Sequence, residues 1–181
     1  TITNDAPTTF PLGETIVTWT ATDSSGNSAS ATQTITVVDT TAPVLIPPES
    51  IIQEAINHEA NLVRIGTSES TDVMDISSIT NDAPEVFPLG DTIVTWTATD
   101  SSGNSASATQ TITIVDTTLP TIMTPADVEV EAISMENNLV EFGFAEASDQ
   151  VEISTITNDA PTTFPLGDTI VTWTATDSSG N

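Results

Sequence analysis

The chain has 181 residues, of which 26 are Asp or Glu and only one is Lys or Arg, giving a formal net charge of −25. This charge argues against nucleic acid and anionic membrane surfaces as partners, because both are bound through basic patches, and it favours a cation partner. The absence of Cys excludes disulfides and thiolate metal sites, and no segment approaches the ~20 apolar residues of a membrane span.

One phrase, ITNDAP, begins at Ile2, Ile79 and Ile156, so the sequence repeats every 77 residues (79 minus 2 and 156 minus 79). Self-similarity at a fixed period indicates a tandem array. We divide the chain into the C-terminal part of one repeat (1–39), a complete repeat (40–116) and a repeat without its last strand (117–181). We expect a window on a longer array, with strand exchange between chains as the alternative.

Short alternating segments separated by Pro, Gly, Asn and Asp fill the complete repeat, and no stretch has a 3.6-residue apolar period. This pattern is typical of a small all-β sandwich, for which we expect seven or eight strands. Segment 92–100 is the clearest strand, and its alternation directs inward Val94, Trp96 and Ala98. A hairpin loop follows at 100–104, where Gly103 can adopt a positive φ. The next strand, 105–116, should bury Ala108, Ile112 and Ile114.

The third repeat shows the same alternation in two further segments. Segment 138–145 should direct inward Val140, Phe142 and Phe144. Segment 126–132 places Val128 and Val130 on one face. Tandem repeats pack against their sequence neighbours only, so the predicted architecture is a row of Ig-like sandwiches, like beads on a rod.

The phrases VTWTATDSSGN, FPLG and VVDTTAPV resemble hyalin-repeat (HYR) domains and, more broadly, the Ig-like repeats of bacterial and archaeal surface proteins. The resemblance covers the whole chain. It implies an Ig-like β-sandwich, an extracellular location at the cell surface, a role in adhesion or as a spacer, and no catalytic residue. The animal hyalin repeat usually has a disulfide, so the lack of Cys points to a prokaryotic version.

Acidic residues should converge where one repeat joins the next, at residues 39–43 (the first joint) and 116–120 (the second joint). An Ig-like sandwich places two of its loops at the end where the chain enters. The candidate ligands at the first joint are Asp39, Glu69 or Asp72, Asp100 and Asn104. Those at the second joint are Asp116, Glu146 or Asp149, Asp177 and Asn181.

Carboxylates this close repel one another, and Ca²⁺, a hard cation with about six to eight oxygen ligands, would relieve that repulsion. We therefore predict that Ca²⁺ is bound at the joints. The alternative is that these residues serve only the turns, because Asp in a DSSGN hairpin commonly accepts hydrogen bonds from turn amides.

Other titratable residues suggest no further site. His58 is the only histidine, and the third repeat has Met135 in its place, so we interpret His58 as a loop residue rather than part of a catalytic triad. The acidic pairs Glu54 with Glu59 and Glu131 with Glu136 are predicted to form a solvated face.

These observations predict a structural protein rather than an enzyme, namely a repeat of an extracellular filament, stalk or surface-layer protein. Its partners would be divalent cations and adjacent repeats or copies of itself along the filament. The rival interpretation is an adhesin that binds a glycan or protein, and a third is an accessory domain of an enzyme. Glycan-binding surfaces usually expose Trp or Tyr, whereas this chain lacks Tyr and keeps every Trp in the same strand phase, which favours a scaffold.

Overall fold

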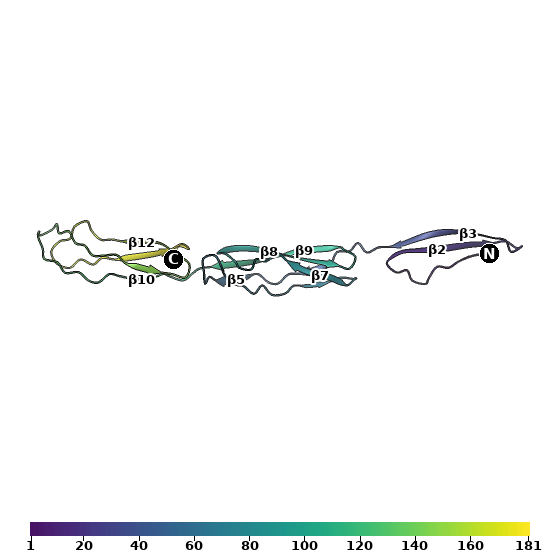
Figure 1. The fold of residues 1–181 in the computed structure, drawn as a ribbon, viewed down its shortest axis with the longest axis horizontal. Helices are drawn as coiled ribbons and strands as arrows, with labels where there is room; N and C mark the ends of the chain where they lie inside the picture. Colours follow the sequence, from purple (N-terminus) through teal and green to yellow (C-terminus); the bar gives the residue numbers. More distant parts are fainter. The chain divides into compact units, whose positions relative to one another are not determined.

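The computed structural model describes residues 1–181 as strands joined by turns and loops, without a helix (Figure 1). The all-β class predicted from the alternation is therefore confirmed. No helical segment has the length and apolar character that a membrane span requires.

The strands recur from repeat to repeat. The first repeat contains β1 (Ile2–Asn4), β2 (Gly13–Thr22) and β3 (Ser28–Val37). The complete repeat contains β4 (Val44–Ile46), β5 (Ile51–Glu54), β6 (Glu69–Thr71), β7 (Ile76–Asn81), β8 (Gly90–Asp100) and β9 (Ser105–Val115). The third repeat contains β10 (Thr121–Met123), β11 (Glu146–Ser148), β12 (Ile153–Asn158) and β13 (Trp173–Asp177).

The complete repeat has a four-stranded sheet in the order β5-β9-β8-β7 and a two-stranded sheet formed by β4 and β6. Strand β5 pairs with β9 in parallel. These six strands are fewer than the seven or eight expected, because residues 61–67 contribute only an isolated bridge between Asn61 and Phe87. The main-chain oxygen of Ile65 in this segment accepts its hydrogen bond from the Gln110 side chain instead of a neighbouring strand.

The chain forms two compact units. The first comprises Thr1–Ile46, Ser68–Thr80 and Thr97–Ala108, and it contains the β1-β2-β3 sheet, the β4–β6 pair and the turn between β8 and β9. The second comprises Pro47–Thr67, Asn81–Trp96 and Thr109–Asn181, and it contains β5 and the strands β10 to β13.

Trp96 lies in the core of the complete repeat, as the alternation in β8 predicted. It is 5% exposed, while Val94 and Ile112 are fully buried. Its Nε1 donates to Gln110 Oε1 at 3.1 Å, and Gln110 Nε2 donates to the main-chain oxygens of Glu49 at 2.8 Å and Ile65 at 3.0 Å. The buried Gln110 side chain thus gives the Trp96 N–H a hydrogen-bond acceptor. It also connects the segments that contain Glu49 and Ile65 to β9.

The predicted inward face of 138–145 is wrong at Phe144, which is 90% exposed. Gly143 has a φ of 79°, which interrupts the alternation by one residue, so Ala145 is buried in its place. Val128 and Val130 are half-exposed and belong to no strand. Their counterpart in the complete repeat, β5, is held by β9, and no strand of the third repeat occupies the place that β9 has in the complete repeat.

The repeated phrase ITNDAP forms the end of a strand and the turn after it, and this turn is bonded to the Trp strand. Asn81 Oδ1 accepts from the amide of Ala83 at 3.1 Å, and Asp82 Oδ1 accepts from the amide of Thr95 at 2.6 Å. The other two copies make the same bonds, through Asp5 and Asp159. The phrase therefore serves the fold.

Candidate metal centre

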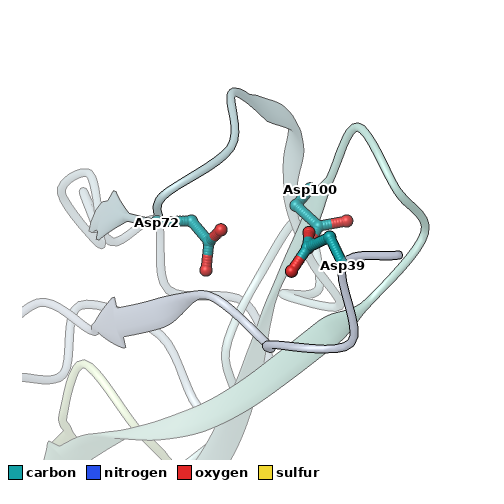
Figure 2. Close-up of side chains that lie close together, drawn as sticks. All are labelled: Asp39, Asp72 and Asp100. Carbon is teal, nitrogen blue, oxygen red and sulfur yellow. The ribbon is translucent and has the colours of Figure 1, made fainter. Parts of the chain in front are cut away.

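Three carboxylates from separate segments meet in the first compact unit (Figure 2). Asp39 lies in the first joint, Asp72 follows β6, and Asp100 ends β8. One carboxylate oxygen of each lies within 4.8 Å of the other two. Asp100 is only 2% exposed. We call this group the first cluster.

The second compact unit contains the same arrangement 77 residues later. Asp116 of the second joint, Asp149 after β11 and Asp177 at the end of β13 bring oxygens within 4.8 Å of one another, and we call them the second cluster. Asp177 is also 2% exposed. Arg64 is the only Lys or Arg in the chain, so basic side chains cannot neutralise both clusters.

The hairpin loop orients the most buried carboxylate of each cluster. Asp100 Oδ1 accepts from the amides of Ser102 at 2.8 Å and Asn104 at 2.9 Å, and Oδ2 accepts from Asn104 Nδ2 at 2.9 Å. Burial acts to raise the pKa of Asp100, but the bonds from Asn104 and the loop amides outweigh it and hold that pKa below its ordinary value. Asp177 has a lowered pKa from the same balance, with Asn181 as its partner. Both groups are therefore charged at neutral pH.

The first repeat shows what this hairpin does alone. Asp23 accepts from the amides of Ser25 at 2.8 Å and Asn27 at 2.9 Å and from Asn27 Nδ2 at 3.0 Å. The turn bonds thus form without a cluster, as the turn-only alternative requires. That alternative does not account for the convergence of Asp39 and Asp72 on Asp100.

Asn104 connects the hairpin to the first joint. Its Nδ2 lies 3.3 Å from both the main-chain oxygen and Oδ2 of Asp39. Asn181 also contacts the second joint, where its Nδ2 donates to the main-chain oxygen of Asp116 at 3.1 Å but not to the Asp116 carboxylate. The two Asn residues predicted as ligands therefore lie at the clusters as donors to their carboxylates and carbonyls.

The structure separates the alternatives that the sequence left open. Glu69 lies within β6, paired with Ile46, and is exposed, whereas Asp72 in the following turn joins the first cluster. At the second joint, Glu146 likewise lies within β11 and is exposed, whereas Asp149 joins the second cluster. Asp72 Oδ1 also accepts from the amide of Met74 at 2.8 Å, so the turn fixes its direction.

Asp116 has one oxygen without a protein partner. Its Oδ1 accepts from the amide of Thr118 at 3.2 Å. Its Oδ2 is buried and takes part in no hydrogen bond. At the first joint the matching oxygen is contacted by Asn104, but Asn181 donates to the Asp116 carbonyl and to Asp177 instead. A buried carboxylate oxygen without a partner is uncommon in folded proteins.

Sequence reasoning missed Glu54, which it assigned to a solvated face. The Glu54 carboxylate accepts three hydrogen bonds from the second joint, contributed by the Thr117 amide, the Thr117 hydroxyl and the Thr118 hydroxyl. The bond from the Thr117 amide is the main reason that the pKa of Glu54 is lowered. Glu54 is exposed, as the prediction of a solvated face requires, but its carboxylate is also bonded to the second joint, which the sequence did not indicate.

The model of the HYR domain family matches residues 1–37, 38–114 and 115–181, which together cover the whole chain. The chain belongs to the HYR-domain family. Its 77-residue units are thus tandem HYR repeats, as the motifs indicated.

Two relatives are proteins named hyalin. That of Lytechinus variegatus is 40% identical over 187 residues, covering 95% of this chain and 35% of the relative. That of Strongylocentrotus purpuratus is 38% identical over 194 residues, covering 99% of this chain and 16% of the relative. A third, the sushi, von Willebrand factor type A, EGF and pentraxin domain-containing protein 1 of Rattus norvegicus, is 38% identical over 104 residues, 55% of this chain and 3% of that protein.

The chain therefore spans about a third or less of the length of these relatives. They come from sea urchins and a rodent, so they give no support to the prokaryotic origin expected from the missing cysteines. That origin stays a prediction.

Proposed function

We propose that these HYR repeats are a structural segment of an extracellular filament, stalk or surface layer, and that Ca²⁺ bound at each joint fixes the linker to the loops of the following repeat. The segment has no catalytic role in this proposal. Its partners are adjacent repeats, or further copies along the filament, and divalent cations. The family, the tandem repeats and the two acidic clusters support it.

The main observation in support of this proposal is that Asp116 Oδ2 is buried and has no hydrogen-bond partner. Leaving such an oxygen without a partner costs free energy, and placing two further carboxylates near it adds repulsion. A divalent cation would remove both penalties, because it would bind this oxygen and offset the charge of Asp149 and Asp177. No turn function requires these three oxygens to converge.

The oxygen spacing suits Ca²⁺. Calcium binds oxygen ligands at roughly 2.3–2.6 Å, so two ligands on opposite sides of one ion are about 5 Å apart. The cluster oxygens lie within 4.8 Å of one another, which is inside that limit. Extracellular calcium modules commonly have Kd values of about 10⁻⁴ to 10⁻³ M, and we expect this range here.

Burial of Trp96 supports a scaffold over an adhesin for the complete repeat. Trp96 is 5% exposed in the complete repeat and its indole N–H is bonded to Gln110, so it offers no surface on which a sugar could stack. The sequence has no Tyr to take that role. His58 Nδ1 is buried without a hydrogen-bond partner, so no carboxylate orients this ring as a catalytic triad would require.

Substituting Asp116→Ala tests the proposal by isothermal titration calorimetry of the whole chain with calcium. The wild-type chain should bind two ions and the Asp116→Ala variant one, because the second cluster loses the oxygen with no other partner. Asp127→Ala removes the same charge at an exposed position outside both clusters and should still bind two. Two ions bound by Asp116→Ala would contradict the assignment.

A further inference from the structure

The second joint is held by the repeat that precedes it. The Thr117 amide donates to Glu54 Oε1 at 2.7 Å, the Thr117 hydroxyl donates to Oε2 at 3.1 Å, and the Thr118 hydroxyl donates to Oε1 at 3.1 Å. Both carboxylate oxygens therefore hold the two residues that directly follow Asp116.

The sheet fixes Glu54 at this position. Strand β5 ends at Glu54, which is in register with Val115 at the end of β9, and the Ala55 amide donates to the Val115 main-chain oxygen at 2.6 Å. Ala55 is itself buried, with 1% exposure. Although the Glu54 side chain is exposed, its main chain is part of the folded repeat, so it is an ordered acceptor at the point where β9 becomes linker.

The same few residues are held by the following repeat as well. Asn181 donates to the Asp116 main-chain oxygen, and Asp116 belongs to the second cluster. Thr118 joins the two sides, since its amide donates to Asp116 Oδ1 while its hydroxyl donates to Glu54. An ordered Thr118 therefore determines where the Asp116 carboxylate points.

We propose that Glu54 is a positioning residue for the second cluster, because it holds Thr117 and Thr118 and thereby fixes Asp116 before any cation arrives. The part of this inference that concerns metal affinity rests on the proposed function. If the linker is already ordered, cation binding does not have to supply the free energy of ordering it. The apparent affinity of the second cluster for the cation is then higher. Glu54 would thus connect the end of one folded repeat to the metal site of the next.

The chain contains its own controls. Glu131 is the counterpart of Glu54 in the third repeat, and it is exposed and holds no linker residue. At the first joint, Thr41 donates to Asp39, and the position 77 residues before Glu54 lies outside this sequence, so this contact is not present in the chain. The first cluster therefore serves as the comparison, a metal site whose joint is not held by a Glu side chain.

The test compares Glu54→Ala with Glu131→Ala in the whole chain. In calcium-free buffer with a chelator, hydrogen exchange of the Thr117 amide should be about tenfold faster in Glu54→Ala, because its acceptor is gone. In a calcium titration followed by NMR, the Kd of the second cluster should rise about tenfold while that of the first cluster stays unchanged. Glu131→Ala should change neither quantity.

A charge-neutral variant separates positioning from loss of negative charge. Thr118→Val keeps every carboxylate and removes the hydroxyl that joins Glu54 to the Asp116 turn, so it should also weaken binding at the second cluster only. An unchanged Thr117 exchange rate in Glu54→Ala, or equal weakening at both clusters, overturns the inference. If the wild-type chain binds no calcium, the proposed function fails, and the exchange rate alone decides whether Glu54 positions the joint.

Discussion

Replacing Trp96 with Ala should lower the free energy of unfolding of the complete repeat by about 4 kcal/mol, the usual range for truncating a buried Trp. The side chain is 5% exposed, and Val94 and Ile112 of the same repeat are fully buried. The change also removes the donor to Gln110 Oε1, an amide that is itself 1% exposed. Far-UV circular dichroism during denaturant unfolding measures the loss.

Trp19 is the matched control, because it occupies the same position in the first repeat and bonds to Gln33 in the same way, but is 41% exposed. We expect Trp19→Ala to cost about 1 kcal/mol, since much less apolar area leaves water on folding. A cost for Trp96→Ala no larger than that for Trp19→Ala would show that Trp96 is not central to the core.

Asn61→Ala should cost about 3 kcal/mol, because it removes a fully buried amide and leaves part-buried main-chain groups of Ile56 and Asn57 without partners. Asn61 is fully buried, and its Oδ1 accepts from the amides of Ile56 at 2.8 Å and Asn57 at 3.2 Å. Its Nδ2 donates to the main-chain oxygens of Asn57 at 2.8 Å and Phe87 at 3.0 Å. This one amide closes the loop after β5 and ties it to Phe87. Thermal and denaturant unfolding would measure the effect.

Asn57→Ala provides the comparison within the same loop. Asn57 is exposed, and its side chain accepts one bond, from the Glu59 amide. Its removal should cost well under about 1 kcal/mol, since water can replace the bond. Equal costs for the two substitutions would contradict the role assigned to Asn61.

The alternation in β8 was sufficient to predict the core, because a strand with one buried face fixes every second side chain. The same rule failed at Phe144, where the positive φ of Gly143 shifts the alternation by one residue. Gly66 has the corresponding conformation in the complete repeat, with a φ of 82°. The sequence signal for this break in the alternation was therefore a glycine at the same position of both repeats, Gly66 and Gly143.

The acidic clusters could be predicted in part. The predicted sandwich brought Asp39 near Asp100, because the loops at one end of a sandwich lie close together. The 77-residue period then predicted the same for Asp116 and Asp177. Pattern alone could not choose between Glu69 and Asp72, since that choice depends on whether the residue falls inside β6 or in the turn after it.

Glu54 and Asn61 escaped sequence reasoning because their partners are main-chain groups and linker threonines, which carry no distinctive pattern. A signal was nevertheless present. Segments 40–77 and 117–154 differ at most positions, yet both keep Glu and Asn at these places, as Glu54 with Glu131 and Asn61 with Asn138. Asn138 makes the same four side-chain bonds in the third repeat as Asn61 makes in the complete repeat.

The most direct test of calcium at the joints is a crystal structure of the chain grown with millimolar calcium, in which anomalous scattering locates the ions. We predict one ion bound by Asp39, Asp72 and Asp100 and a second bound by Asp116, Asp149 and Asp177, with Asp116 Oδ2 among its ligands. Well-ordered joints without an anomalous peak at either cluster would contradict the account and identify these carboxylates as solvated turn residues.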